Sequence, residues 1–129
     1  YRGYKGLVEL AKKYEAYFIL PEQYSKFAAF ELMNIGLPVI LPSEDFLFHL
    51  SSSNNYWFGS GLYKNTTEVC EWYNEYYDQF ALYIDDFEEI PETFKIVKEH
   101  KKKIRGIMKK CAKEHQSKTL DQWRKIYNV

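Results

Sequence analysis

Two short apolar runs, each closed by a proline, constrain the fold of this chain more than any other feature. They are residues 16–20 (AYFIL, followed by Pro21) and residues 38–42 (PVILP). Neither run alternates polar and apolar residues, which is typical of strands covered on both faces. Each run follows a segment whose apolar residues recur at helical spacing. Because strands that alternate with helices are joined by crossover connections, the pattern predicts a parallel sheet.

The segments around these runs complete an α/β pattern. Helices are expected at residues 5–14 and 25–35, and a third begins after Ser43, which can cap it. Gly36 can take the left-handed conformation that ends the second helix. A third short strand is expected at residues 81–85. We therefore predict a partial Rossmann-like parallel sheet of about three short strands, flanked by helices and followed by a helical C-terminus.

The C-terminal region is expected to contain separate helices. A short helix opens at Pro91, a second continues to Cys111, and a last one covers residues 119–127. In the last helix, Leu120, Trp123 and Tyr127 recur at helical spacing and are expected on its buried side.

Composition bounds the class of protein. The chain has 129 residues, of which 46% are hydrophobic and 19% aromatic, so a disordered chain is excluded. The length predicts one domain, residues 1–129. No apolar run approaches the roughly 20 residues that a membrane-spanning helix needs. Cys70 and Cys111 fit neither a disulfide framework nor a zinc site, so we expect two packing thiols in the cytoplasm.

The charges are balanced overall and separated along the chain. Residues 1–94 hold 6 basic and 15 acidic residues, whereas residues 95–129 hold 12 basic and 3 acidic residues. The basic region is either a surface for phosphate, nucleic acid or anionic membrane, or a solvated helix face that leans on the acidic half. Of the 18 basic residues 15 are Lys, whereas Arg is preferred for bidentate phosphate contacts. This favours the second interpretation, and no nucleic-acid partner is expected.

The segment that follows the first strand has the features of a ligand site. A short loop leads from this strand to the N-terminus of a helix, where free backbone N–H groups can bind an anion. Ser25 and Lys26 add a hydroxyl and a positive charge there. Glu31 lies in the otherwise apolar run FAAFELM, where a carboxylate either has a partner or faces water.

Two other groups of polar residues have simpler explanations. The acidic run at residues 85–89 is either a metal cluster or a strand end followed by a helix start. It lacks a D-x-D spacing, and acidic residues are favourable at a helix N-terminus, so we prefer the second. His49, His100 and His115 have no neighbours at ligand spacing. We therefore expect no metal site.

Residues 30–40, FELMNIGLPVI, resemble the donor-binding half of glycosyltransferases with the GT-B fold. Many retaining members carry two Glu separated by seven residues, followed by Ala-Met-x-x-Gly-x-Pro-Val. The resemblance assigns Glu31 to the second Glu, which accepts hydrogen bonds from the nucleotide ribose. The first Glu falls on Gln23, an amide that can still bond sugar hydroxyls. Tyr24, Ser25 and Lys26 fall on the loop that holds the donor pyrophosphate.

The resemblance covers nearly the whole chain, apart from residues 51–80. It implies a piece of the donor-binding half of a longer enzyme that transfers a sugar from a nucleotide-sugar to an acceptor hydroxyl. The implied partners are the nucleotide-sugar as co-substrate, an acceptor glycan or small molecule, and the missing N-terminal half of the enzyme. No metal or other cofactor is implied, and an open sheet edge would invite self-association. The alternative is a non-catalytic interaction domain that docks a partner through its basic C-terminal helices.

Overall fold

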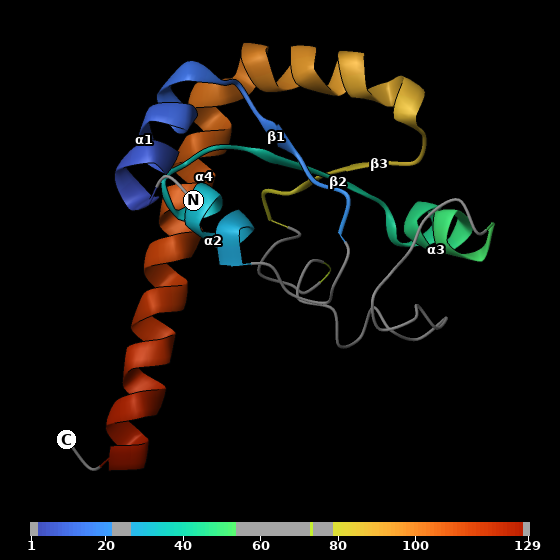
Figure 1. The fold of residues 1–129 in the computed structure, drawn as a ribbon. Helices are drawn as coiled ribbons and strands as arrows, with labels where there is room; N and C mark the ends of the chain where they lie inside the picture. The colour runs from blue at the N-terminus through green and yellow to red at the C-terminus, as the bar shows by residue number, and fades with distance from the viewer. Residues whose placement is uncertain (1–2, 22–26, 54–72, 74–78, 128–129) are drawn as a thin grey trace.

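The computed structural model describes residues 3–21, 27–53, 73 and 79–127 (Figure 1). As far as β3, the described helices and strands follow one another as the sequence predicts, with three strands in one sheet. In chain order the elements are α1 (Gly3–Lys13), β1 (Tyr17–Phe18), α2 (Phe27–Asn34), β2 (Val39–Pro42), α3 (Glu44–Ser52), β3 (Leu82–Ile84), the 3-10 helix η3 (Phe87–Glu89) and α4 (Ile90–Tyr127).

The three strands form a parallel sheet in the order β1-β2-β3, which confirms the predicted fold class. Tyr17 is in register with Val39, and Ile40 is in register with Leu82. All four residues of the central strand β2 are buried, as its continuous apolar sequence predicts. The same prediction is wrong for β1 at Tyr17, which is 40% exposed, because β1 lies at an edge of the described sheet, where fewer neighbouring side chains flank its own.

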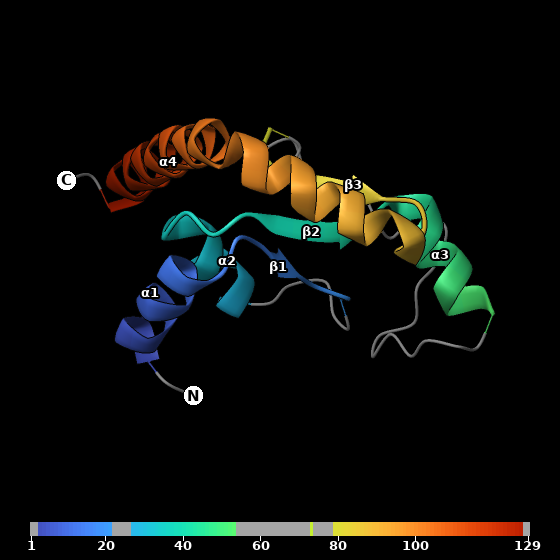
Figure 2. The ribbon, with the colours of Figure 1, turned by 90° about the horizontal axis from the view of Figure 1, so that it is seen from above.

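Helix α4 supplies core residues to both faces of β2. Successive residues of a strand point to opposite faces, so Val39 and Leu41 share one face and Ile40 occupies the other. The core cluster that contains Val39 and Leu41 includes Met108 of α4, and the cluster that contains Ile40 includes Val97 of the same helix. Ile104 packs against both clusters. Figures 1 and 2 show how α4 runs along the sheet and then turns away from it.

Arg105 of α4 joins the N-terminal helices to the rest of the fold. Its Nε donates to the carbonyl of Gly36 at 2.8 Å, and its Nη2 donates to the carbonyl of Ala11 at 2.7 Å. Ala11 lies in the last turns of α1, and Gly36 follows α2 with a φ of 83°. Helix ends leave such carbonyls without intrahelical partners, and a cation is favourable there. Arg105 therefore stabilises the ends of two helices at once.

The prediction of separate C-terminal helices is wrong, because α4 is one helix of 38 residues. No proline follows Pro91, and no residue pattern between residues 112 and 118 stops a helix. The expected burial of the last turns is also wrong: Leu120, Trp123 and Tyr127 are 49%, 53% and 62% exposed. Their helical spacing places them near one another, but the sheet ends before it reaches them (Figure 1).

Candidate functional site

The carboxyl edge of the sheet, where β1, β2 and β3 end, is the candidate site. Ligands of open parallel sheets bind outside this edge. Here the backbone N–H of Ser43 donates to the carbonyl of Ile84 at 2.7 Å, so the ends of β2 and β3 lie together. Ser43 Oγ accepts from the N–H of Phe46 at 3.2 Å, which confirms Ser43 as the cap of α3.

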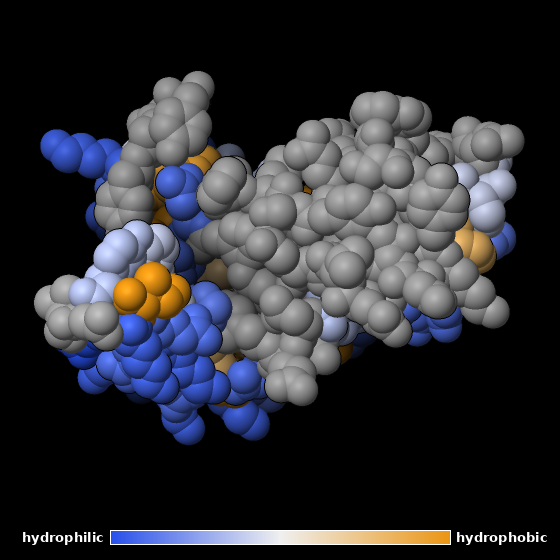
Figure 3. All heavy atoms as spheres, turned by 90° about the horizontal axis from the view of Figure 1, so that it is seen from below, coloured by the Kyte–Doolittle hydropathy of each residue, from blue (hydrophilic) through white to orange (hydrophobic). Residues whose placement is uncertain are grey.

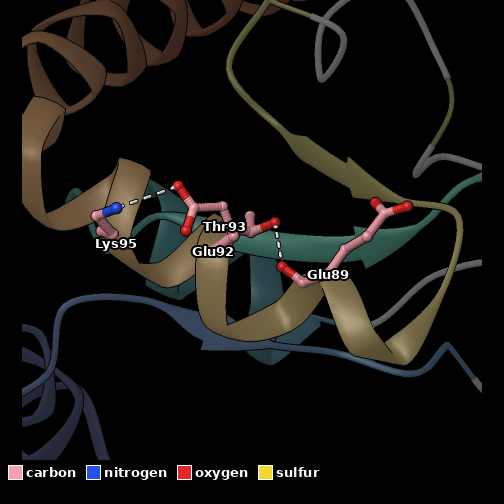
Figure 4. A network of polar contacts seen from close by, with 4 residues as sticks. All are labelled: Glu89, Glu92, Thr93 and Lys95. Atoms are coloured by element: carbon pink, nitrogen blue, oxygen red, sulfur yellow. Dashed lines mark hydrogen bonds and ion pairs between the residues drawn. The ribbon is translucent and has the colours of Figure 1, made fainter.

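Carboxylates at the end of β3 form local caps. Asp86 Oδ1 accepts from the N–H of Glu88 at 2.9 Å and so caps η3. Glu89 Oε2 accepts from the N–H of Asp85 at 3.2 Å, and Figure 4 shows the Glu89 side chain extending toward the end of β3. The interpretation of residues 85–89 as a strand end and a helix start is confirmed. Within the described part of the chain, no group of three or more residues is arranged to hold a metal ion.

The first turn of α4 continues this pattern of local contacts (Figure 4). Thr93 Oγ1 donates to the carbonyl of Glu89 at 2.9 Å, and Lys95 pairs with Glu92 at 3.5 Å. Both Lys95 and Glu92 are exposed, so water screens the pair and it adds little stability.

An aromatic cluster covers the same edge, and the sequence did not reveal it. The rings of Phe46 and Phe87 lie 5.0 Å apart, and those of Phe18 and Phe87 lie 6.3 Å apart, both edge to face. Each residue lies at or just after the end of a different strand, which is the signal that could have predicted their meeting. Phe87 remains 44% exposed, so an apolar surface reaches solvent here.

Tyr73 contacts the end of the central strand. Its hydroxyl donates to the carbonyl of Pro42 at 2.9 Å, and its ring stacks on Tyr83 of β3 with centroids 5.7 Å apart. Proline has no N–H, yet its carbonyl still needs a donor when it is buried. Tyr73 supplies that donor and so ties residues far along the chain to this edge.

Glu31 is the one predicted donor-binding residue that the structure describes. It lies in the second turn of α2 and is partly buried, next to the buried Leu32 and Met33. Gln23, Tyr24, Ser25 and Lys26 lie outside the described residues, so their arrangement around Glu31 is not given. Helix α2 begins at Phe27, immediately after them, as the sequence predicts to within two residues.

Among the described residues, two hollows are lined by residues other than Glu31 and the edge carboxylates. One of about 520 Å³ lies over α1, and one of about 510 Å³ lies over α4 beside Arg105 and Gly106. Lys101, which lines the second, forms an ion pair with Glu15. The hydrogen bond from Lys101 lowers the pKa of Glu15 below its ordinary value. Together with Arg105, this pair uses part of the basic surface to hold α4 on the N-terminal region.

Cys111 is a packing residue, as predicted. Its thiol is buried in the cluster around Met108 and donates to Gln79 Oε1 at 3.2 Å. Burial raises the pKa of the thiol, which keeps it in its unreactive protonated form. Cys70 lies outside the described residues.

Comparisons with known proteins add no family to this geometry. No family model matches the chain, and no curated protein or solved structure matches it. None of the helices in the described ranges is long and apolar enough to cross a membrane.

Proposed function

We propose that the chain is the donor-binding part of a glycosyltransferase that transfers a sugar from a nucleotide-sugar to an acceptor hydroxyl. Glu31 fixes the nucleotide ribose in this proposal, and Gln23 together with residues 24–26 holds the sugar and the diphosphate. The acceptor site and the remaining catalytic groups belong to a longer chain, so transfer is expected from that chain. The proposed enzyme is cytoplasmic and uses no metal cofactor.

One observation carries the proposal. A partly buried carboxylate, Glu31, lies on a helix that follows β1 in the chain, ends at Asn34 and leads through Gly36 into the buried strand β2. Loops at the carboxyl ends of parallel strands are where open α/β sheets bind nucleotides. A carboxylate that is held in place on a helix can accept two hydrogen bonds from a ribose diol.

The proposed chemistry depends on positioned charges more than on a nucleophile. A departing nucleoside diphosphate and an oxocarbenium-like sugar are both stabilised by groups that are already fixed when the substrate binds. The rigid part of this site is the helix that carries Glu31, which is held by contacts with α1, β2 and α4. Residues 23–26 contain the hydroxyl, the amide and the Lys cation that this proposal assigns to the sugar and the phosphates.

Calorimetric titration with UDP, GDP and their sugars tests the proposal. We expect one nucleotide-sugar to bind saturably, and we expect Glu31→Ala to weaken that binding by about 1.5–3 kcal/mol, the range for a hydrogen bond to a charged group. Such a loss is roughly a tenfold to hundredfold rise in Kd. Glu9→Ala is the matched control, because it removes an exposed carboxylate from α1.

Equal affinities of the wild type and Glu31→Ala would contradict the assigned role of Glu31. If no nucleotide-sugar binds, the same titration and a transfer assay are repeated with the longer chain. Failure there as well would overturn the proposal.

A second candidate is a non-catalytic interaction domain, and one observation favours it. The last turns of α4 expose Leu120, Trp123 and Tyr127 to solvent among cationic side chains. Exposed aromatic residues grouped on one surface are typical of docking sites. This candidate predicts partner binding that weakens steeply with salt and does not change in Glu31→Ala.

A further inference from the structure

The end of α4 is a surface that the proposed donor site does not use. Leu120, Trp123 and Tyr127 are spaced by three and four residues and so share one face of the helix. Trp123 and Tyr127 stack with ring centroids 5.4 Å apart, and both residues are more than half exposed. Figure 3 shows a small hydrophobic group at this end of the molecule, next to pale side chains of intermediate hydropathy and to many hydrophilic ones. We call Leu120, Trp123 and Tyr127 the α4 stripe.

Cationic residues accompany the α4 stripe. Lys113 precedes Leu120 by seven residues and Arg124 follows it by four, so both lie beside the stripe. Residues 109–127 hold six basic and two acidic residues, a net charge of +4. Two such helix ends would repel each other, because like charges would meet across the contact. The stripe is therefore suited to an apolar surface with an acidic border.

The second surface has that chemistry, and it belongs to the same chain. Phe87 is exposed at the carboxyl edge, beside Phe46, and Phe48 of α3 is 39% exposed. Exposed carboxylates flank Phe46 and Phe87 in the sequence, at the start of α3 and from the end of β3 through η3. They are Glu44, Asp45, Asp85, Asp86, Glu88 and Glu89. We call these carboxylates together with Phe87 the acidic edge.

The two surfaces cannot meet within one molecule. Figures 1 and 2 show the end of α4 at one extreme of the molecule, and α3 with the start of α4 at the other. The stripe and the edge are complementary in two properties: both have exposed apolar side chains, and the cationic border of the stripe is opposite in charge to the anionic border of the edge. Because they lie at opposite ends, the stripe can reach an acidic edge only on another copy, and a two-fold arrangement in which each copy contributes one stripe and one edge would close the contact.

We propose that the chain forms a two-fold dimer in which the α4 stripe of each copy docks on the acidic edge of the other. Such a dimer contains the contact twice and leaves no stripe or edge unused. A closed pair also explains why the helix can extend beyond its own sheet, because the second copy supplies the apolar surface that covers it. The proposal does not depend on nucleotide-sugar binding, and its test contains no nucleotide.

Sedimentation velocity and light scattering of the whole chain test this dimer with two charge-reversed variants. One is Lys113→Glu/Arg124→Glu, which makes the border of the stripe acidic. The other is Glu44→Lys/Asp45→Lys/Asp85→Lys/Glu88→Lys, which changes the net charge of the six edge positions from −6 to +2 and leaves Asp86 and Glu89, which accept backbone hydrogen bonds, in place. We expect the wild type to reach twice the 15.5 kDa mass of one chain as its concentration rises, and to dissociate as salt is added. Each variant alone should dimerise at least tenfold more weakly.

The decisive sample is an equimolar mixture of the two variants. Each variant then has the partner surface that the other needs, so we expect the mixture to form a heterodimer at concentrations at which each variant alone is largely monomeric. Lys118→Glu/Lys125→Glu is the matched control, because these residues lie on the opposite side of the helix and their reversal should leave the dimer intact. Circular dichroism verifies that every variant is folded.

Three results would overturn the proposal. They are a wild type that stays monomeric at all concentrations, a dimer that persists in both charge-reversed variants, and a mixture that fails to associate. The second result would instead support pairing through the open sheet edge. A loss of association in the control variant to the same extent as in Lys113→Glu/Arg124→Glu would also count against the docking of this face.

Discussion

The two halves of α4 have the same backbone structure and opposite surroundings. Residues 90–111 form the proximal half, in which Val97, Met108 and Cys111 are buried against the sheet. Residues 112–127 form the distal half, in which no residue is buried. Both halves carry apolar residues at helical spacing. The comparison teaches that the spacing decides which residues share a face, whereas the surface opposite decides whether that face is buried.

The distal half is held as a helix by weak local contacts. Asp121 pairs with Arg124 at 3.2 Å, Lys110 pairs with Glu114 at 3.9 Å, and Trp123 stacks on Tyr127. Such pairs stabilise a helix by about 0.2–0.5 kcal/mol each. A helix of this length is marginal on its own, so the distal half depends on the packed proximal half to nucleate it.

Truncating one apolar residue in each half gives the largest expected difference. Met108→Ala removes a fully buried side chain and should lower the free energy of unfolding by about 2–5 kcal/mol. Trp123→Ala removes an exposed one and should change it by less than about 0.5 kcal/mol at low protein concentration. Urea denaturation measures both. Similar losses in the two variants would show that the distal half is buried in the monomer.

Replacing one arginine in each half gives the next largest difference. Arg105→Met leaves the carbonyls of Ala11 and Gly36 without their donor and should cost about 2–3 kcal/mol. Arg124→Met removes an exposed pair with Asp121 and should cost less than about 0.5 kcal/mol. Amide hydrogen exchange should show α1 opening first in Arg105→Met. Unchanged protection of α1 would argue against the joining role of Arg105.

Replacing the single glycine inside α4 should stabilise the protein, whereas the preceding substitutions should destabilise it. Nothing lies within 4 Å of a Cβ built on Gly106, and this residue is exposed. Gly106→Ala should therefore raise the free energy of unfolding by about 0.8–1 kcal/mol through helix propensity. Gly36→Ala is the contrasting control, since its φ of +83° is strained for a residue with a side chain and a loss is expected. Thermal unfolding monitored by circular dichroism ranks the three proteins.

The smallest expected effect is the pH dependence from Glu15, which pairs with Lys101 of the proximal half. The pKa of Glu15 is lowered in the folded state, so the pair stabilises the protein above the ordinary value of 4.5. That stabilisation is lost as the pH falls from there through the folded pKa. Glu15→Gln should therefore unfold with a weaker pH dependence below about 4.5. Lys101→Met should reproduce this behaviour, and an unchanged pH profile in both variants would refute the linkage.

Most of the fold was predictable from the sequence, because its signals are local. Pro21 and Pro42 mark the ends of apolar strands, Ser43 caps a helix, and Gly36 takes the left-handed turn. The continuity of α4 was not predicted, because residue types mark the ends of helices more clearly than they mark an uninterrupted helix. Its exposed end was missed because helical spacing carries no information about what lies opposite.

The candidate site was predictable only in part. Glu31 is placed on its helix as expected, whereas residues 23–26 lie outside the described chain. The meeting of Phe18, Phe46 and Phe87 requires three segments to converge, and so does the reach of Arg105 to two helix ends. Contacts of this kind depend on the order of the strands in the sheet, which no local pattern in this sequence specifies.

The bonds of Arg105 also bear on the order of folding. They join residues 69 and 94 positions apart in the sequence. Contacts of such separation form late, because closing a long segment of chain costs entropy before the bonds repay it. During synthesis, α1 and α2 emerge from the ribosome well before residue 105 does. The ends of these helices therefore lack the hydrogen bonds from Arg105 until α4 has been synthesised. Until then their apolar faces are accessible to chaperones.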